Sequence, residues 1–215
     1  MHIISVNVGL PREVHWKGER VSTGIFKEPV AGRVVARKLN LDGDRQADLT
    51  VHGGEEKAVY AYPAEHYDYW RQELPNTALP WGVFGENLTT SGLLEDAVNV
   101  GDQFRVGAAL LQATQPRLPC YKLGLKFGRA DMVRRFLASG RYGWYFAVVE
   151  EGKVGVGDTI ERVYRDPHNL TVADIARLYL RERHNRAMMQ RAVEHEGLPA
   201  SWRASFQERL EQRTH

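Results

Sequence analysis

Residues 144–149 read Trp-Tyr-Phe-Ala-Val-Val, and Glu-Gly-Lys follows at 151–153. Aromatic and β-branched side chains favour extended backbone, and a glycine between charged residues favours a turn. This stretch therefore predicts a buried strand that ends in a tight turn. Many short strands at close spacing predict a β-barrel or a sandwich-like fold. The other strand signals lie at residues 3–8, 98–100, 104–106 and 109–114, with a closing strand expected at 155–163.

Helical signals interrupt this pattern and then replace it. Residues 64–74 follow Pro63, which suits the first turn of a helix, and residues 130–138 end near Gly140, which suits a helix C-terminus. A different kind of segment begins after Asp166-Pro167.

Three helices are expected in the C-terminal segment. Thr171, with Asp174 three residues later, predicts a capped helix start. A second helix is expected from about 186 to 195, and a third begins near Pro199. The third carries a stripe of large apolar side chains: Trp202, Phe206 and Leu210.

The chain therefore divides into two predicted domains. Residues 1–165 form an α+β, mainly β domain, a β-barrel with peripheral helices, and residues 166–215 form a small three-helix unit. The helical unit has eight arginines against seven acidic residues and no lysine, so it lacks the basic surface of a DNA reader. A docking or dimer-forming appendage fits this composition better.

Composition excludes several classes of partner. The 215 residues carry a net charge of +2, too little to indicate nucleic acid or membrane binding. The chain has neither an apolar run of membrane-spanning length nor an N-terminal signal pattern. One cysteine and no export signal predict a reducing, cytoplasmic setting.

The single cysteine, Cys120, lies in the segment Gln-Pro-Arg-Leu-Pro-Cys-Tyr-Lys at 115–122. Two prolines stiffen this segment, and Arg117 and Lys122 supply positive charge that favours the reactive thiolate. Free cysteine is also a common small residue of protein cores. Local sequence alone leaves a packing role and a chemical role equally open for Cys120.

Three other polar clusters follow predicted strands. His52, Gly53 and Gly54 lead to Lys57 and could hold an anion, or could form a hairpin with solvated charges. The turn at 85–87, Gly-Glu-Asn, places a carboxylate beside an amide. The alternative is an ordinary turn in which the asparagine bonds its own backbone.

The third cluster, Gly-Ile-Phe-Lys at 24–27, ends in Lys27, a possible phosphate contact or a solvated side chain. Other chemistries fit poorly. No histidine pair has zinc-site spacing together with Cys120, and the chain lacks a Gly-x-Ser-x-Gly elbow, a Walker loop and a dinucleotide fingerprint. A papain-like thiol hydrolase that pairs Cys120 with His52 stays open.

Taken together, these segments resemble the MOSC domain, the molybdenum-cofactor sulfurase C-terminal domain, and more closely its YiiM-like branch with an added three-helix domain. The resemblance rests on motifs in a common order: residues 24–30, 48–54, 84–88, 115–120, 143–145 and 197–202. It covers nearly the whole chain. It implies a MOSC-type β-barrel that binds a molybdopterin-type cofactor, with Cys120 as the molybdenum ligand.

The chemistry of the quoted residues is compatible with that implication. A thiolate is a soft ligand for molybdenum, and cationic side chains can neutralise the pterin phosphate. Glu86 and Asn87 could pair with the heterocycle, and the paired glycines let the backbone approach it. The expected cofactor-binding residues are Lys27, His52, Gly53, Gly54, Lys57, Glu86, Asn87, Arg117 and Tyr121.

The resemblance implies an oxidoreductase that reduces N-hydroxylated base analogues and hydroxylamines to amines. The chain has no flavin, nicotinamide or iron–sulfur motif, so a separate reductase or ferredoxin-like protein would supply the electrons. The helical unit is then a docking surface or a cover for the barrel. Two alternatives stay open: a carrier that holds sulfur on Cys120 as a persulfide, and a pterin-binding module without turnover. The sequence leaves monomer and homodimer open.

Overall fold

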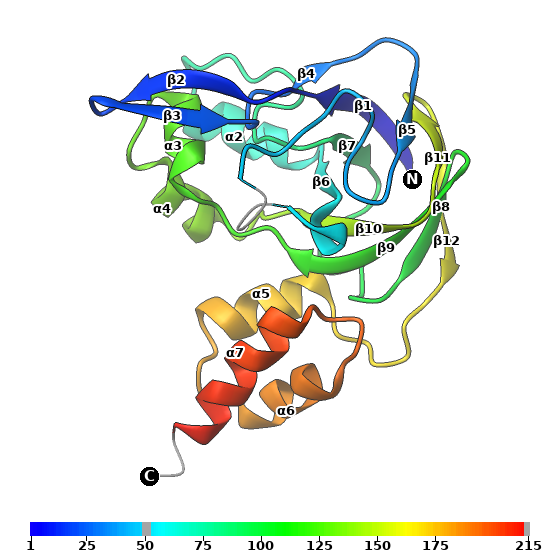
Figure 1. Cartoon of the computed structure of the whole chain (residues 1–215). Helices are drawn as coiled ribbons and strands as arrows, with labels where there is room; N and C mark the ends of the chain where they lie inside the picture. The colour runs from blue at the N-terminus through cyan, green and yellow to red at the C-terminus, as the bar shows by residue number, and fades with distance from the viewer. Residues whose placement is uncertain (49–52, 213–215) are drawn as a thin grey trace.

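A computed structural model describes residues 1–48 and 53–212. Figure 1 shows a curved sheet, helices along one side of it, and three C-terminal helices packed beneath it. In the described residues no helix is both long and apolar enough to cross a membrane.

The main sheet has eight strands in the order β12-β8-β9-β10-β6-β7-β1-β4. Neighbouring strands run antiparallel except β6 and β7, which pair in parallel. The bounds are β1 (His2–Val8), β4 (Glu28–Pro29), β6 (Val59–Pro63), β7 (Leu88–Ser91), β8 (Gln103–Val106), β9 (Ala109–Pro116), β10 (Trp144–Glu150) and β12 (Ile160–Tyr164). The predicted buried strand at 144–149 is therefore β10, which lies in the interior of the sheet between β9 and β6.

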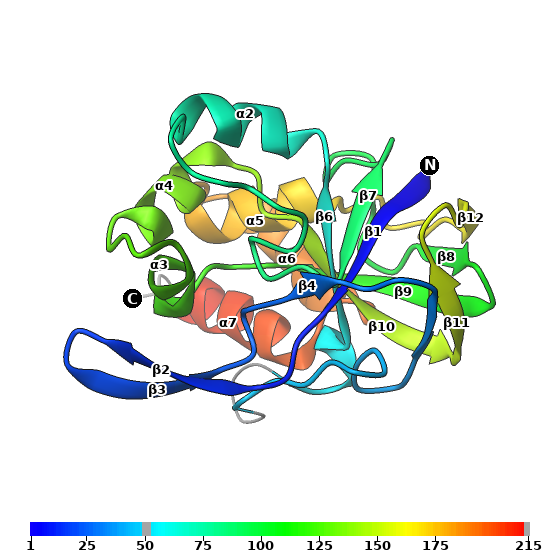
Figure 2. The ribbon, with the colours of Figure 1, turned by 90° about the horizontal axis from the view of Figure 1, so that it is seen from above.

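Two small two-stranded sheets complete the β structure. One is the hairpin β2 (Arg12–Trp16) and β3 (Glu19–Thr23), and the other pairs β5 (Arg33–Ala36) with β11 (Gly152–Gly155). Seen from above, the β2–β3 hairpin extends away from the body of the molecule (Figure 2). This hairpin was not predicted, because its residues are mostly polar or charged and only partly buried.

The predicted α+β, mainly β fold class is confirmed, but the barrel is not closed by a continuous strand ladder within the described chain. Strand β1, which lies next to the edge strand β4, meets the residues ahead of β12 through one isolated bridge, His2 with Thr159. Backbone hydrogen bonds from Ile160 N to Met1 O (2.9 Å) and from Ile3 N to Asp158 O (3.0 Å) flank this bridge. The contact stays short because it involves mainly the turn ahead of β12.

The prediction of a single closing strand at 155–163 is wrong, because this turn interrupts it. The structure divides this stretch into β11, which ends at Gly155, and β12, which starts at Ile160. Gly157 between them has a φ of 84°, a conformation that breaks a strand and that glycine adopts easily. Asp158 fixes the turn by accepting a hydrogen bond from Gly155 N at 2.9 Å.

Helices α2 (His66–Glu73), α3 (Tyr121–Phe127) and α4 (Met132–Ser139) lie together on one side of the sheet (Figure 2). They enclose an aromatic core that includes Tyr62, Trp70, Phe84 and Phe136. Helices α2 and α4 were expected at these places. The short helix α3 was missed, because two prolines precede it and a glycine lies inside it.

The predicted C-terminal helices are confirmed as α5 (Val172–Leu180), α6 (Arg186–Glu194) and α7 (Ala200–Glu211). The expected capping box is present, since Asp174 N donates to Thr171 Oγ1 at 3.0 Å and Thr171 N donates to Asp174 Oδ2 at 3.1 Å. Helix α7 buries Trp202 and Phe206 in the same hydrophobic core as the sheet. The division into domains at 165/166 stays a prediction.

Glu95 connects helix α2 to the start of β10. Its carboxylate accepts hydrogen bonds from His66 Nε2 at 2.8 Å and from the backbone nitrogen of Gly143 at 2.7 Å. Burial acts to raise the pKa of Glu95, but these hydrogen bonds outweigh it and hold the pKa below the ordinary value of 4.5. Because Arg117 N donates to Gly143 O at 3.3 Å, Glu95 also helps to position the segment that carries Cys120.

Replacing Glu95 with glutamine is expected to lower the free energy of unfolding at neutral pH by about 2–3 kcal/mol, because a buried, charge-assisted hydrogen-bond network is lost. A carboxyl group with a lowered pKa stabilises the fold above its ordinary titration range, and this contribution disappears as the pH falls through the lowered pKa. The stability gap between variant and wild type should therefore close below the ordinary value of 4.5.

Urea unfolding over a series of pH values measures this gap. The matched control is Glu19→Gln in the exposed β2–β3 hairpin, which should leave stability unchanged at every pH. A gap that stays constant from neutral to acidic pH would show that ionisation of Glu95 does not stabilise the fold.

Candidate functional site

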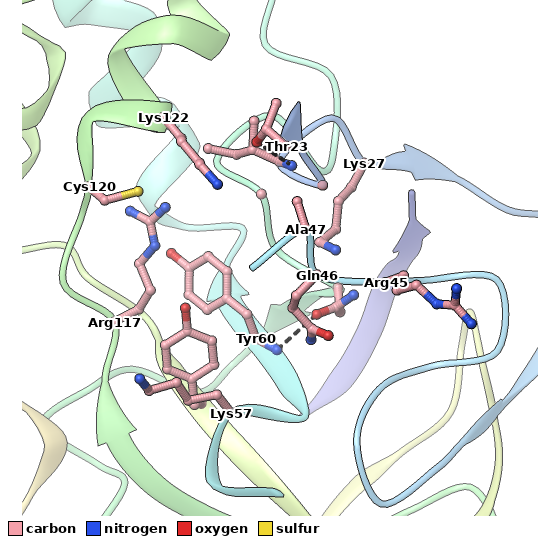
Figure 3. A pocket seen from close by; sticks show the side chains of 15 residues that line it. Thr23, Lys27, Arg45, Gln46, Ala47, Lys57, Tyr60, Arg117, Cys120 and Lys122 are labelled. Carbon is pink, nitrogen blue, oxygen red and sulfur yellow. Dashed lines mark hydrogen bonds between the residues drawn. The ribbon is translucent and has the colours of Figure 1, made fainter. Parts of the chain in front are cut away.

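A cavity opens where the end of β9, the start of α3 and the loops after β3 and β5 come together (Figure 3). Its described lining residues include five cationic side chains and no carboxylate. The cations are Lys27, Arg45, Lys57, Arg117 and Lys122. A hollow with this lining attracts an anionic ligand.

Cys120 lines this cavity from the irregular segment between β9 and α3. The residue is partly exposed, and Figure 3 shows its sulfur beside the guanidinium of Arg117. Lys122, from the first turn of α3, reaches toward the same space (Figure 3). Positive charge next to a cysteine favours the thiolate, which is the form that attacks electrophiles and binds metals.

Arg117 is the most deeply buried of these five cations. It is 6% exposed, and its guanidinium lies 5.4 Å from the ring centroids of both Tyr60 and Phe136. Burial acts to lower the pKa of Arg117, but Tyr60, Tyr145 and Cys120 outweigh it and raise the pKa. Within the described chain its buried Nη1 has no hydrogen-bond partner. A buried, charged donor that has no hydrogen-bond partner, in a cavity that attracts anions, indicates a ligand-binding group.

Lys27 is balanced by the protein itself. Its ammonium donates a short hydrogen bond to Asp44 Oδ1, and Asn87 Nδ2 donates to Asp44 Oδ2 at 2.9 Å. Burial lowers the pKa of Lys27, although Asp44 opposes that effect. Asn87 also accepts from Tyr60 N at 3.1 Å. Lys27 and Asn87 therefore line the cavity, but their polar groups mainly hold its wall together, and their role in cofactor binding stays a prediction.

The structure does not bring Glu86 to the cavity. Its carboxylate is fully buried and accepts hydrogen bonds from Gly82 N at 2.8 Å, Phe84 N at 3.1 Å and Thr89 Oγ1 at 3.1 Å. Tyr67 donates a further short hydrogen bond to it. Burial raises the pKa of Glu86 against these bonds. Its surroundings make Glu86 the centre of a structural turn rather than a partner for a heterocycle.

The remaining predicted residues separate into three groups. Lys57, at the end of the short helix η1 (Glu55–Lys57), lines the cavity, whereas Gly53 and Gly54 just before it do not. Tyr121 also lies outside the lining and is 54% exposed. His52 falls outside the described residues, so its predicted place beside Cys120 stays a prediction.

Comparison with known proteins identifies the family to which this chain belongs. Residues 48–161 match the MOSC domain model, and residues 170–213 match the YiiM-like, 3-alpha helix domain. The chain belongs to the MOSC family. It is 41% identical to YflK of Bacillus subtilis over 95% of its own length and 92% of that protein.

Solved structures of MOSC relatives agree with the fold. The crystal structure of YiiM from Geobacillus stearothermophilus has a TM-score of 0.83 and 39% identity, and the match covers 97% of this chain and 98% of the other. A protein named "Reductase" from Gibberella moniliformis is 33% identical over 75% of this chain, but the match covers only 29% of that longer protein. The predicted membership of the MOSC family and its YiiM-like branch is therefore confirmed.

Several residues that line this cavity were not predicted from the sequence. Tyr60 and Tyr145 come from the middle of the sheet, with ring centroids 5.4 Å apart, and nothing in their strand patterns marks them as cavity residues. Arg45 comes from a loop. A glycine is needed at position 24, because a Cβ there would lie 2.3 Å from Arg45 O. The glycine of the Gly-Ile-Phe-Lys motif is therefore a local sequence signal for this wall.

One group of possible metal ligands lies outside the lining of the cavity at Cys120. Among the described residues, Asp166, His168 and His195 bring one ligand atom each within 4.8 Å of the others. His195 already contacts Val100 O through Nε2 at 3.0 Å and accepts from Gly197 N through Nδ1 at 3.2 Å. Both ring nitrogens of His195 are thus used within the protein, and the cluster connects the end of α6 to the turn before β8.

Proposed function

We propose that this chain is a molybdenum-cofactor-dependent oxidoreductase that reduces N-hydroxylated compounds to amines. One observation carries the proposal: Cys120 lies in a cavity whose described lining holds five cations and no carboxylate. A polyanionic ligand with a soft metal centre fits both features. Membership of the MOSC family and the relative named "Reductase" support the same conclusion.

The residues present fit the molybdenum cofactor. The thiolate of Cys120 would be the protein ligand to the metal. The buried Nη1 of Arg117 is ready for a charge-assisted hydrogen bond to a phosphate or another anionic group of the pterin. Lys57 and Lys122 add charge at the same place. When bound, the cofactor would supply two-electron redox chemistry.

The proposed reaction breaks the N–O bond of an N-hydroxylated substrate. Two electrons and two protons enter, and the amine and one water leave. A separate redox protein of the reductase or ferredoxin-like class would supply the electrons, because the chain carries no redox motif of its own. Burial raises the pKa of Tyr145, so its hydroxyl stays protonated in the cavity and serves as a hydrogen-bond donor. A working thiol requires a reducing compartment, and we assign the reaction to the cytoplasm.

Metal and pterin analysis of protein made in molybdate-supplied cells tests the proposal. The loaded protein should contain molybdenum in stoichiometric amount and reduce hydroxylamine and N6-hydroxyadenine with a reduced viologen as electron donor. Metal-free protein that carries a sulfane sulfur on Cys120 would favour the persulfide carrier instead. Loaded protein that reduces neither compound would leave only the pterin-binding module.

Replacing Arg117 with methionine is expected to reduce pterin retention about tenfold or more, because a buried charge-assisted hydrogen bond to the ligand is lost. Pterin content per chain after gel filtration measures the effect. Arg105→Met is the matched control, since Arg105 is a partly exposed arginine that pairs with Glu150 on the sheet, outside the cavity lining. Equal pterin content in both variants would contradict a ligand-binding role for Arg117.

A further inference from the structure

A second cleft adjoins the cavity described above, and Cys120 lines both. We call it the helix-side cleft, and it is lined by Lys57, Gln115, Pro116, Leu118, Cys120, Tyr145, Tyr179 and Trp202. It holds about 300 Å³, which is the lower end of the range for ligand cavities. Lys57, Cys120 and Tyr145 line both hollows, so the two spaces adjoin at these residues.

The far wall of the helix-side cleft comes from the C-terminal helices. Tyr179 of α5 and Trp202 of α7 pack with ring centroids 4.9 Å apart. Trp202 Nε1 donates to Gln115 Oε1 at 2.6 Å, which fixes the indole against β9. The guanidinium of Arg209 lies 4.3 Å from the centroid of the Tyr179 ring. The wall is therefore aromatic and held in place before any ligand binds.

The chemistry of the lining selects one kind of occupant. Two aromatic rings face a space that Pro116 and Leu118 also line, and such surfaces bind flat apolar rings. Lys57 is the one charged side chain in the described lining, so the fixed charge of this lining is positive. A neutral or anionic ring is accepted there, whereas a cationic ring is repelled. Gln115 is engaged by Trp202, so shape contributes more than hydrogen bonding to recognition.

We infer that Tyr179 and Trp202 form a subsite for a neutral or anionic planar ring of the substrate, which places the reacting N–OH group toward Cys120. The inference rests on the proposed function, because it takes the cofactor to fill the first cavity and leaves the helix-side cleft for the substrate. Helices α5 and α7 thereby contribute to substrate binding.

Binding of simple rings to the molybdenum-loaded protein tests the subsite without turnover. Calorimetry with adenine, a neutral ring, should show binding that Tyr179→Leu weakens about tenfold, the loss expected for one stacking contact. Benzamidine, a cationic ring, should not bind. The control is Tyr164→Leu, which removes an exposed tyrosine of β12 and should bind adenine like the wild type. Wild-type protein that fails to bind adenine, or that binds benzamidine equally well, would overturn the subsite.

Kinetics separate the subsite from the proposed function. Tyr179→Leu should raise the KM for N6-hydroxyadenine about tenfold with little change in kcat, while hydroxylamine, which has no ring, should be reduced at the wild-type rate. Trp202→Phe, which keeps a ring but loses the hydrogen bond to Gln115, should show a smaller increase in KM. If both substrates respond equally to Tyr179→Leu, the subsite is wrong although the reductase activity stands. If adenine binding depends on Tyr179 but nothing is reduced, the proposed function fails and the ring site remains.

Discussion

Replacing Cys120 with serine is expected to remove molybdenum and reductase activity together while the fold stays intact. Serine keeps the size of the side chain but exchanges a soft, easily ionised thiol for a hard hydroxyl. Loss of a residue that merely supports a metal ligand costs about 10–100-fold in affinity or activity, so loss of the ligand itself should cost at least about 100-fold. Metal content per chain and kcat/KM with a viologen donor measure the two effects.

The single cysteine allows a sharper version of this experiment. Because the chain has one cysteine, a mass shift of one alkyl group reports on Cys120 alone. Loaded protein should resist alkylation, and protein stripped of its cofactor should be labelled. Cys120→Ser should unfold at the wild-type temperature, since the side chain is partly exposed. Stoichiometric molybdenum in Cys120→Ser would rule out the sulfur as the metal ligand.

Replacing Glu86 with alanine is expected to lower the free energy of unfolding by about 3–5 kcal/mol, because several buried donors lose their acceptor at about 1–3 kcal/mol each, and this is a large share of the 5–15 kcal/mol typical of a folded protein. The substitution leaves Tyr67 and the backbone nitrogens of Gly82 and Phe84 buried without their acceptor. Such unpaired donors carry the full cost of desolvation. Urea unfolding measures the loss.

Two comparisons sharpen the test of Glu86. Glu86→Gln keeps one acceptor oxygen but turns an NH₂ group toward one of the donors, so its loss of stability should be intermediate. Glu19→Ala in the exposed hairpin should change little. If Glu86→Ala keeps wild-type stability but no longer retains the pterin, the role in cofactor binding predicted from sequence is right and the structural role is wrong.

Local pattern was sufficient for much of the fold. The aromatic and β-branched run at β10, the capping box at Thr171 and the apolar stripe of α7 each depend on residues only a few positions apart. Backbone preference and side-chain period act over that distance, so these elements could be predicted. The β2–β3 hairpin and α3 could not, because a polar hairpin and a short helix with an internal glycine are specified mainly by what they pack against.

The candidate site shows the same division. Arg117, Cys120 and Lys122 are close in the chain, and their shared positive surroundings were visible in the sequence. The turn at 85–87 had the composition of a ligand contact, yet its glutamate faces the core. The direction of a side chain in a turn depends on the hydrogen-bond donors around it. For Glu86 these donors are the backbone nitrogens of Gly82 and Phe84, and no periodic sequence pattern marks their positions.

The sequence by itself determined that one thiol lies in a stiff, cationic segment after a strand, and that three helices follow the β domain. Only the tertiary structure decided what surrounds that thiol. It brought Tyr60 and Tyr145 from the sheet, and Tyr179 and Trp202 from the C-terminal helices, to hollows that meet at Cys120. The physical reason is that local order follows from neighbouring residues, whereas contacts between distant segments follow from how the whole core packs.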